Sequence, residues 1–276
     1  MKSSVVKAGV LRIFQSFVGY SWIFFTFALM SFTSGNIGIH TLGTDTNKDS
    51  LKAVVSSGGE KEFQSFFAAN NGVGSTRNED AFLEISPKAV PFVQEYSRRE
   101  SSRLEALRTW GQRYLKLYDG ILEQYGLPKE LKYLSVIESD LKAKSVSVAG
   151  ATGPWQIMAA QARNLGLKIN GRVDERRDYT KSTHAAAKML KSLYGEFGDW
   201  LLVIAAYNAG PSKVQKAMRK HNSSNFWDIQ YSLPKETRNH VKKFIATHYI
   251  LEGEGGVTTL TAAEIEALDM ELETEG

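Results

Sequence analysis

Cysteine is absent from the whole chain of 276 residues. Its absence excludes a disulfide framework, a thiolate metal site, a cysteine nucleophile and a lipid-modified cysteine. The chain also lacks an H-E-x-x-H pair, a P-loop, a G-x-S-x-G elbow and a G-x-G-x-x-G turn, so no metal and no cofactor are expected. We expect the five histidines to be surface or half-buried side chains: His40, His184, His221, His240 and His248.

Each end of the chain lacks charged residues of one sign. Residues 1–34 contain no acidic residue, whereas residues 252–276 contain eight acidic residues and no Lys or Arg. The middle, residues 35–251, holds 31 basic and 22 acidic residues. A basic body indicates an anionic partner or surface. Nucleic acid is a rival partner, but the cations are scattered rather than interleaved with aromatics in a stripe, and the export pattern described next argues against it.

Residues 13–44 contain no Asp, Glu, Lys or Arg, and the run Phe17–Phe32 is densely apolar. The cations Lys2, Lys7 and Arg12 precede this run. A basic start followed by an apolar segment is typical of an export signal, and cations on that side place the body outside the cytoplasm. Residues 1–34 are therefore a cleaved signal peptide or an uncleaved membrane anchor, with residues 13–34 as the apolar part. We expect the protein in the periplasm or cell envelope.

The rest of the chain divides by composition. Residues 35–85 are rich in Gly, Ser, Asn and Thr and are predicted to be a flexible linker. From residue 86, apolar residues recur every three or four positions, which predicts helices over 90–125, 128–139, 159–165, 182–194, 199–208, 212–220 and 234–251. Ser182 and Asp199 are expected as N-caps and Gly210 as a helix end. The acidic tail, 252–276, is predicted to form a short helix from the capping box of Thr261 and Glu264.

Alternation of period two is nearly absent, and residues 142–157, rich in Ser, Ala and Gly, are predicted to be a loop or short hairpin. The fold class is therefore mainly α, a helical domain over 86–251 with at most a short β-hairpin. Its size is sufficient for a single hydrophobic core.

One carboxyl group has an unusual setting. Glu138 ends the apolar helix segment Tyr133–Ser139, just before the Gly/Ser-rich loop. Apolar neighbours disfavour the ionised carboxylate, as a general acid near neutral pH requires. From periodicity alone, the preferred interpretation is that Glu138 caps the helix or forms a salt bridge.

The surrounding motifs change this preference. Three blocks, Glu138–Ser139, Ser147–Met158 and Ala205–Gly210, resemble the signature blocks of lytic murein transglycosylases of the soluble-lytic-transglycosylase, goose-lysozyme-like superfamily. Further matches are Val173–Asp178, Phe197–Trp200 and Leu233–Arg238, and together they are most similar to the membrane-bound murein transglycosylase D branch. The resemblance runs from about Val90 to Tyr249 and implies a lysozyme-like (α+β) fold.

The resemblance also implies roles. Glu138 would be the catalytic acid; the substrate-binding residues would be Ser147, Gln156, Met158, Tyr207, Asn208 and Glu236. The hydroxyl of Tyr207 would lie in reach of the carboxyl group of Glu138. The chain has His240 where many relatives have Tyr, and Ser212-Lys213 where they often have Gly-Asn. Neither departure is expected to affect the chemistry.

The implied reaction needs one carboxyl group. Glu138 would protonate the glycosidic oxygen of a MurNAc-β-1,4-GlcNAc bond, and its carboxylate would then accept the proton of the C6 hydroxyl, giving 1,6-anhydro-MurNAc. A hydrolytic muramidase, lysozyme or chitinase-like glycosidase remains an alternative. It would need a second carboxylate, for which the candidates are Asp174, Glu175, Asp178 and Glu236. A non-catalytic cell-wall-binding protein is the alternative from another class.

The expected partners are peptidoglycan glycan strands and, if the anchor is uncleaved, the membrane; the protein is expected to be a monomer that binds no nucleic acid. Exposed aromatic rings could stack on sugars, and the candidates are Trp155, Trp200, Trp227 and Tyr231. Trp200 begins an apolar helix, so it is better explained as a core residue.

Overall fold

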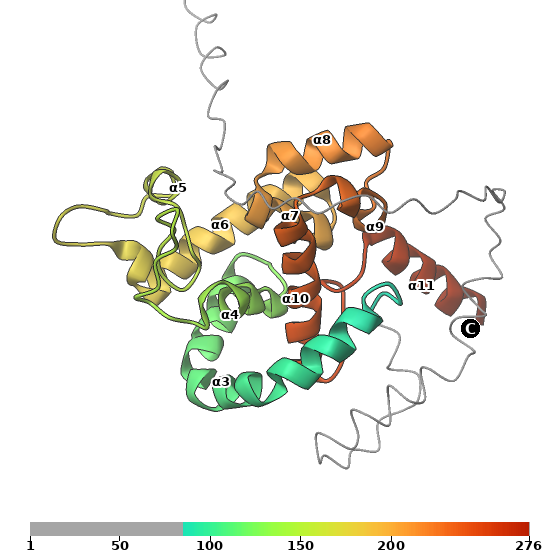
Figure 1. The fold of residues 1–276 in the computed structure, drawn as a ribbon, viewed down its shortest axis with the longest axis horizontal. Coiled ribbons are helices and arrows are strands. Elements are labelled where there is room, and N and C mark those ends of the chain that lie inside the picture. The colour runs from blue at the N-terminus through green and yellow to red at the C-terminus, as the bar shows by residue number, and fades with distance from the viewer. Residues whose placement is uncertain (1–84, 276) are drawn as a thin grey trace, which may run out of the picture. The chain divides into compact units, whose positions relative to one another are not determined.

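The computed structural model describes residues 85–275, with side chains described up to residue 270. The predicted signal or anchor, residues 1–34, and nearly all of the predicted linker, residues 35–85, lie outside the described residues. The α-helices are α3 (Val90–Gln124), α4 (Tyr133–Ser139), α5 (Ala159–Asn164), α6 (Tyr179–Phe197), α7 (Trp200–Ala209), α8 (Pro211–His221), α9 (Phe226–Ile229), α10 (Lys235–Glu252) and α11 (Ala262–Glu275). Short 3₁₀ helices cover η2 (Lys129–Lys132), η3 (Glu175–Arg177) and η4 (Gln230–Ser232). The prediction of a mainly α fold is confirmed (Figure 1).

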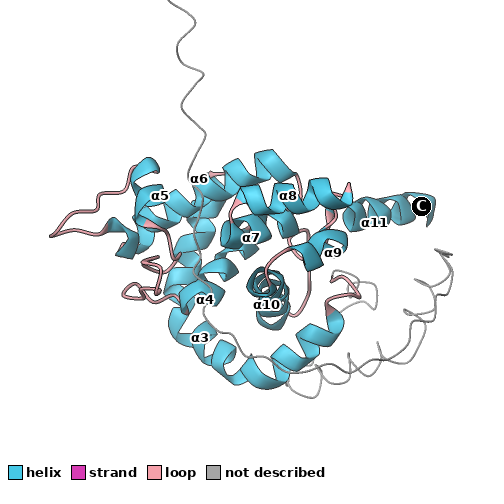
Figure 2. Ribbon diagram, turned by 45° about the horizontal axis from the view of Figure 1, so that its top comes forward, coloured by secondary structure: helices cyan, strands magenta, loops and turns pink. Residues whose placement is uncertain are grey.

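Helix α10 lies at the centre of the domain. Figure 2 looks nearly along its axis and shows it surrounded by α3, α4, α7 and α9. Its buried residues occupy most of its circumference, from Thr237 through Val241, Phe244 and Ile245 to His248. Helix α7 is also buried along almost its full length. Helix α7 is apolar on every side and belongs in a core, and α10 is buried over its second half, so these two helices form a rigid frame for the residues they carry.

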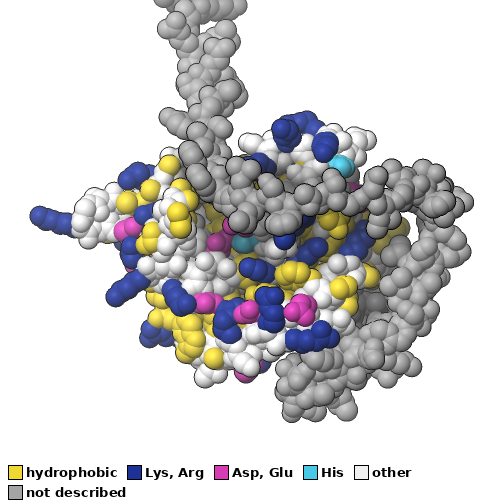
Figure 3. Space-filling model, in the orientation of Figure 1, with side chains coloured by type: hydrophobic (Ala, Val, Ile, Leu, Met, Phe, Trp, Pro, Cys, Tyr) yellow, Lys and Arg dark blue, Asp and Glu magenta, His cyan; other side chains and the backbone are white. Residues whose placement is uncertain are grey.

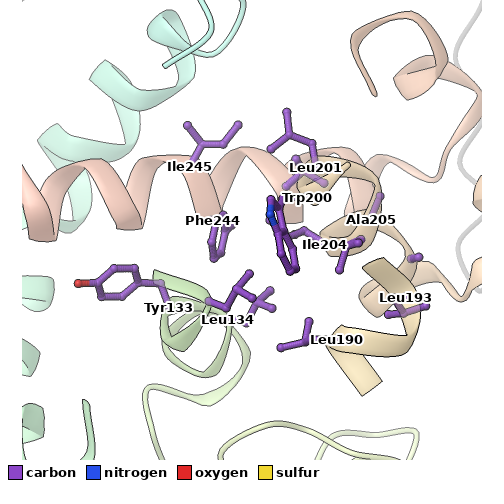
Figure 4. Packing of buried hydrophobic residues seen from close by; sticks show 14 of the residues in the cluster. Tyr133, Leu134, Leu190, Leu193, Trp200, Leu201, Ile204, Ala205, Phe244 and Ile245 are labelled. Carbon is purple, nitrogen blue, oxygen red and sulfur yellow. The ribbon is translucent and has the colours of Figure 1, made fainter. Parts of the chain in front are cut away.

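The core is closed by aromatic and aliphatic side chains from four helices. Figure 4 shows Phe244 and Ile245 of α10, Tyr133 and Leu134 of α4, Trp200, Leu201, Ile204 and Ala205 of α7, and Leu190 and Leu193 of α6 in one cluster. Trp200 is buried and stacks on Tyr194, with 4.1 Å between ring centroids, which confirms it as a core residue. The site described below is therefore built on helices that are already fixed by packing.

Several predicted helix ends match the structure and some do not. Asp199 caps α7 by accepting the N–H of Leu202 at 3.0 Å, and Gly210, with φ of 87°, ends the same helix. The prediction of Ser182 as an N-cap is wrong, because α6 begins three residues earlier and is capped by Asp178. Ser182 lies inside that helix and donates to the carbonyl of Asp178. Of the two possible capping residues, the structure uses Asp178, which gives the longer helix.

The acidic tail forms the predicted helix and contacts the domain. Thr261 and Glu264 form a capping box, in which the N–H of Thr261 donates to Glu264 at 2.8 Å and the N–H of Glu264 to Thr261 at 3.3 Å. The N–H of Ala262 donates to Asp199 at 2.8 Å, and Trp227 donates to Glu264 at 3.3 Å. The start of α11 is therefore bonded to the start of α7. Among the described residues, the structure contains no helix of the length and apolarity that crossing a bilayer requires.

A buried histidine gives the stability of the domain a specific pH dependence. His248 is buried, with Nδ1 3.1 Å from the hydroxyl of Thr258, and burial lowers its pKa from the usual 6.5 to about 4. The unfolded chain takes up this proton below about pH 6.5, whereas the folded protein does so only near pH 4. The free energy of unfolding should therefore fall by about 3 kcal/mol between pH 6.5 and pH 4 from this residue.

Urea denaturation at several pH values, for the wild type and His248→Gln, checks this expectation. The slope of unfolding free energy against pH should be smaller in His248→Gln. A matched control is His221→Gln, which replaces an exposed histidine at the end of α8 and should keep the slope of the wild type. Equal slopes for all three proteins would contradict the prediction.

Candidate active site

Glu138 lies in the last turn of α4, and its side chain is 16% exposed. Its preceding residues Leu134, Ser135 and Val136 are buried, so the helix is held by the core. The helix ends at Asp140, which adopts a left-handed conformation with φ of 52°. Glu138 is thus a largely enclosed carboxyl group on a fixed element, with a small area open to solvent.

The nearest described partner of this carboxyl group is a histidine. Nε2 of His240, on α10, lies 2.9 Å from Oε1 of Glu138, and the side chain of His240 is 9% exposed. His240 therefore contacts the predicted catalytic carboxyl group directly, although its position along the chain gives no sign of this contact. The expectation of surface or half-buried histidines is wrong for His240 and His248, which are both buried.

The loop that follows α4 is bonded to that helix. The hydroxyl groups of Ser135 and Ser139 both donate to the carbonyl of Pro154 at 2.9 Å. Isolated antiparallel bridges join Val146 to Thr152 and Thr152 to Ile157, as expected of at most a short hairpin. The loop is consequently fixed next to Glu138 rather than free to move away from it.

Gln156 and Gly153 have unusual backbone conformations within this loop. Gln156 has φ of 47°, and its amide nitrogen donates to the carbonyls of Gly153 at 2.8 Å and Ser145 at 3.3 Å. Gly153 has φ of 85°, and a Cβ at this position would lie 1.9 Å from the carbonyl oxygen of Arg176. Strained residues persist only where the surroundings hold them, and they cluster at functional sites.

Arg176 closes the loop from outside. Its guanidinium group donates to the carbonyls of Gly150 at 2.9 Å and Ile157 at 3.1 Å. Asp174 orients this guanidinium at 2.8 Å, and the hydrogen bond from Arg176 lowers the pKa of the Asp174 carboxyl group. One partly buried ion pair therefore supports both ends of the segment that contains Gly153 and Gln156.

Tyr207 and Asn208 come from the last turn of α7. The hydroxyl of Tyr207 donates to the carbonyl of Trp155 at 2.7 Å, and the pKa of Tyr207 is raised by burial and by the charge of Glu138. The phenol therefore stays neutral, and its proton is held by the carbonyl of Trp155; no hydrogen bond among the described residues joins it to Glu138. The Oδ1 atom of Asn208 accepts the hydroxyl of Thr237 at 2.8 Å, which joins α7 to α10.

The remaining predicted residues lie around this centre. Ser147 is exposed, and its hydroxyl accepts the N–H of Ala151 at 3.0 Å. Met158 is partly exposed and is the residue before α5. Glu236 is exposed in the first turn of α10, four residues before His240 and therefore on the same face of that helix. No hydrogen bond in the described part of the chain joins any of these three to Glu138.

A cavity of about 250 Å³ adjoins Glu138 on the side of α3. It is lined mainly by polar side chains: Tyr96, Arg99, Glu100, Arg103, Asp140 and Lys243 among them. Arg103 is paired with Asp140 and, at 2.7 Å, with Glu100. This cavity is a polar recess next to the carboxyl group, with acidic and basic groups in balance.

Three of the four candidates for a second carboxylate hold local structure instead. Asp174 pairs with Arg176 and caps η3, and Asp178 caps α6. Glu175 accepts the N–H of Lys168 at 2.7 Å and pairs with Lys181, and both contacts lower its pKa. Only Glu236 among the four is exposed without such a structural role in the described contacts. The described residues contain no cluster of His, Asp and Glu suited to a metal ion.

Most of the aromatic candidates for sugar stacking are buried. Trp155 and Trp227 belong to the core together with Trp200, so none of the three presents a ring face to a ligand. Trp155 donates instead to the hydroxyl of Thr183 at 2.8 Å. Tyr231 is 75% exposed, beneath the guanidinium of Arg238 at 5.4 Å from its ring centroid.

Comparison with known protein families shows which proteins this site resembles. Residues 120–230 match the family model described as the transglycosylase SLT domain. This part of the chain is similar to transglycosylase SLT domains. The match includes Glu138, Ser147, Gln156, Met158, Tyr207 and Asn208, and it confirms the resemblance to lytic murein transglycosylases seen in the sequence motifs.

Curated relatives extend the similarity beyond the SLT domain. The chain is 37% identical over 182 residues to the membrane-bound lytic murein transglycosylase D of Escherichia coli (strain K12), covering 63% of this chain and 40% of that protein. It is 28% identical over 136 residues to the peptidoglycan transglycosylase gp16 of Escherichia phage T7, covering 46% of this chain and 10% of that protein. The chain thus spans less than half the length of these relatives.

Solved structures give a weaker likeness to the SLT domain and its flanks. An inactive mutant of the lytic transglycosylase Slt from Pseudomonas aeruginosa aligns with a TM-score of 0.47 and 16% identity, covering 79% of this chain and 40% of that one.

Proposed function

We propose that this chain is a peptidoglycan lytic transglycosylase that cleaves the MurNAc-β-1,4-GlcNAc bond without water and leaves a 1,6-anhydro-MurNAc end. The observation that carries the proposal is the position of Glu138: a largely enclosed carboxyl group at the end of a buried helix, within the segment that matches the transglycosylase SLT family model. A hydrolase commonly uses two carboxyl groups, whereas an intramolecular nucleophile on the substrate makes one sufficient.

In the proposed reaction, Glu138 first acts as a general acid. It donates its proton to the glycosidic oxygen while the 2-acetamido group of MurNAc assists the departing bond. The resulting carboxylate then accepts the proton of the C6 hydroxyl, and O6 forms a bond to C1. Glu138 is reprotonated at the end, so the cycle needs no cofactor.

The other predicted residues support this centre. Tyr207 is held by its hydrogen bond to the carbonyl of Trp155, and Asn208 is held by the hydroxyl of Thr237. We propose that Ser147, Gln156 and Met158 contact the glycan along the loop side and Glu236 along the α10 side. On the face seen in Figure 3, Lys and Arg side chains are scattered among Asp and Glu rather than gathered in a stripe, which suits a wall polymer better than nucleic acid.

We further propose that the chain is exported to the periplasm or cell envelope and acts there as a monomer on peptidoglycan glycan strands. The support is the charge-free segment of residues 13–44 behind three cations, and the relative from Escherichia coli that is itself membrane-bound. Sequencing the N-terminus of the mature protein tests whether residues 13–34 are cleaved or remain as an anchor.

Product analysis tests the proposed reaction. Purified peptidoglycan incubated with the full chain in detergent micelles should yield fragments that end in 1,6-anhydro-MurNAc, detected by mass spectrometry as a loss of one water relative to hydrolysis products. Fragments with free reducing ends would instead establish a hydrolase and make Glu236 the first candidate for its second carboxylate. Binding of peptidoglycan without any fragment, by folded protein, would establish a wall-binding protein.

A further inference from the structure

His240 contacts the carboxyl group of Glu138 through its Nε2 atom. The two residues are 102 positions apart in the sequence and belong to α10 and α4. Their side chains are 9% and 16% exposed, and Nε2 lies 2.9 Å from Oε1. A contact this short between two enclosed polar groups is a hydrogen bond with a defined donor and acceptor.

We propose that neutral His240 is a positioning residue for Glu138. Its Nε2–H donates to Oε1 in every state of the cycle and leaves Oε2 as the oxygen that holds and moves the proton. This inference rests on the proposed transglycosylase function.

The second ring nitrogen decides which form of the imidazole fits. Nδ1 of His240 is buried and has no hydrogen-bond partner among the described residues. An imidazolium ring, or the tautomer with its proton on Nδ1, would place an N–H donor there without an acceptor. A buried N–H without a partner is destabilising, and orphaned N–H groups are rarer than orphaned acceptors. The form that fits is the neutral ring with its proton on Nε2 and with Nδ1 unprotonated.

This tautomer matches both states of a carboxyl group that acts as acid and then as base. When Glu138 is protonated on Oε2, Oε1 is a carbonyl oxygen and accepts the N–H of His240. When Oε2 has given its proton to the glycosidic oxygen, Oε1 belongs to the carboxylate and accepts the same N–H. The same Oε2 then receives the proton of the C6 hydroxyl. No proton moves on the imidazole, and the carboxyl group does not rotate between the two steps.

The backbone around His240 is held in place by packing, which suits a positioning role. It lies on the central helix α10, between the buried residues Thr237 and Val241. Thr237 is bonded to Asn208 of α7, so the turn that carries His240 is fixed against the helix that carries Tyr207. Lys243, one turn further along α10, lines the cavity next to Glu138, so this face of α10 borders the carboxyl group over two turns.

Enzyme kinetics with matched variants tests the role. His240→Leu removes the donor and should lower kcat about 10- to 100-fold, the value of a hydrogen bond to a charged group, with KM changed less than about twofold. His240→Gln places an amide N–H donor at a similar reach and should stay within about fivefold of the wild type. Equal losses in Leu and Gln, or a loss in KM alone, would overturn the positioning role.

Nuclear magnetic resonance of the full chain, with ¹⁵N-labelled histidine rings, tests the tautomer without any activity. The His240 signals, identified by their absence in His240→Gln, should show a protonated Nε2 and a bare Nδ1 in the wild type. They should keep this pattern in Glu138→Gln, because the Gln side chain also has a carbonyl oxygen for Nε2–H. An imidazolium pattern, or a proton on Nδ1, would overturn the inference even if the enzyme is active. An inactive, folded wild type would overturn the proposed function, while the ring signals would still decide the hydrogen bond.

Discussion

Replacing Glu138 by Gln is expected to lower turnover of peptidoglycan at least about 1,000-fold. One side chain would lose both of its roles, as general acid and as general base, and each role contributes roughly 10²–10⁴-fold to the rate. The Gln side chain has the same shape, and its carbonyl oxygen can accept the N–H of His240 at the position of Oε1. Its NH₂ group, however, cannot donate a proton to the leaving oxygen or accept one from the C6 hydroxyl. The fold should therefore persist while both proton transfers are lost.

Mass spectrometry of the released fragments, together with thermal unfolding of the same preparation, measures both parts of this expectation. Glu105→Gln is a suitable control, because it removes the same charge from the exposed face of α3 and should leave turnover unchanged. Turnover at the rate of the wild type by folded Glu138→Gln would remove Glu138 from the mechanism. Anhydro products would then require another acid.

The second large effect is expected at Gly153. Gly153→Ala should reduce the free energy of unfolding by about 3 kcal/mol, the sum of an unfavourable positive φ and a steric clash. The added Cβ would lie 1.9 Å from the carbonyl oxygen and 2.7 Å from the carbonyl carbon of Arg176, and both are backbone atoms that cannot rotate away. The displaced loop would also move the carbonyl of Pro154 away from the serines of α4, so turnover should fall as well.

A neighbouring glycine separates the two contributions. Gly150 has nearly the same backbone angle, with φ of 84°, but no atom lies within 4 Å of a Cβ added there. Gly150→Ala should therefore cost only the conformational part, about 1 kcal/mol. Urea denaturation of both variants measures the difference between them. If the two variants lose the same stability, the close approach of Gly153 to Arg176 does not constrain the loop.

Local rules predicted most of the helices because the relevant signals lie within a few residues. Asp199 before an apolar run and Gly210 after it define α7, and the capping box of Thr261 and Glu264 defines the start of α11. The same rules failed at α6, where Asp178 and Ser182 both had the chemistry of a cap. Which of two caps is used depends on how far the helix packs, and that depends on distant residues.

The candidate site was predictable where the motif is local and unpredictable where it is not. Glu138 stands out by its position at the end of an apolar helix before a Gly/Ser-rich loop. His240 offers no such signal, because it meets Glu138 only through the packing of α4 against α10. Trp155 was misread as a possible sugar platform, since a sequence does not show that its indole is enclosed by Tyr118 and bonded to Thr183.

The hydrogen bonds from Arg176 to two carbonyls of the loop have a thermodynamic consequence for ligand binding. The carbonyls of Gly150 and Ile157 are joined through one guanidinium group before any glycan arrives. A loop that is ordered in advance loses little conformational entropy when a ligand binds, so more of the contact energy remains as affinity. Glycan strands that differ in length or decoration would then meet one preformed surface at Gln156, and their selection would depend on shape rather than on induced fit.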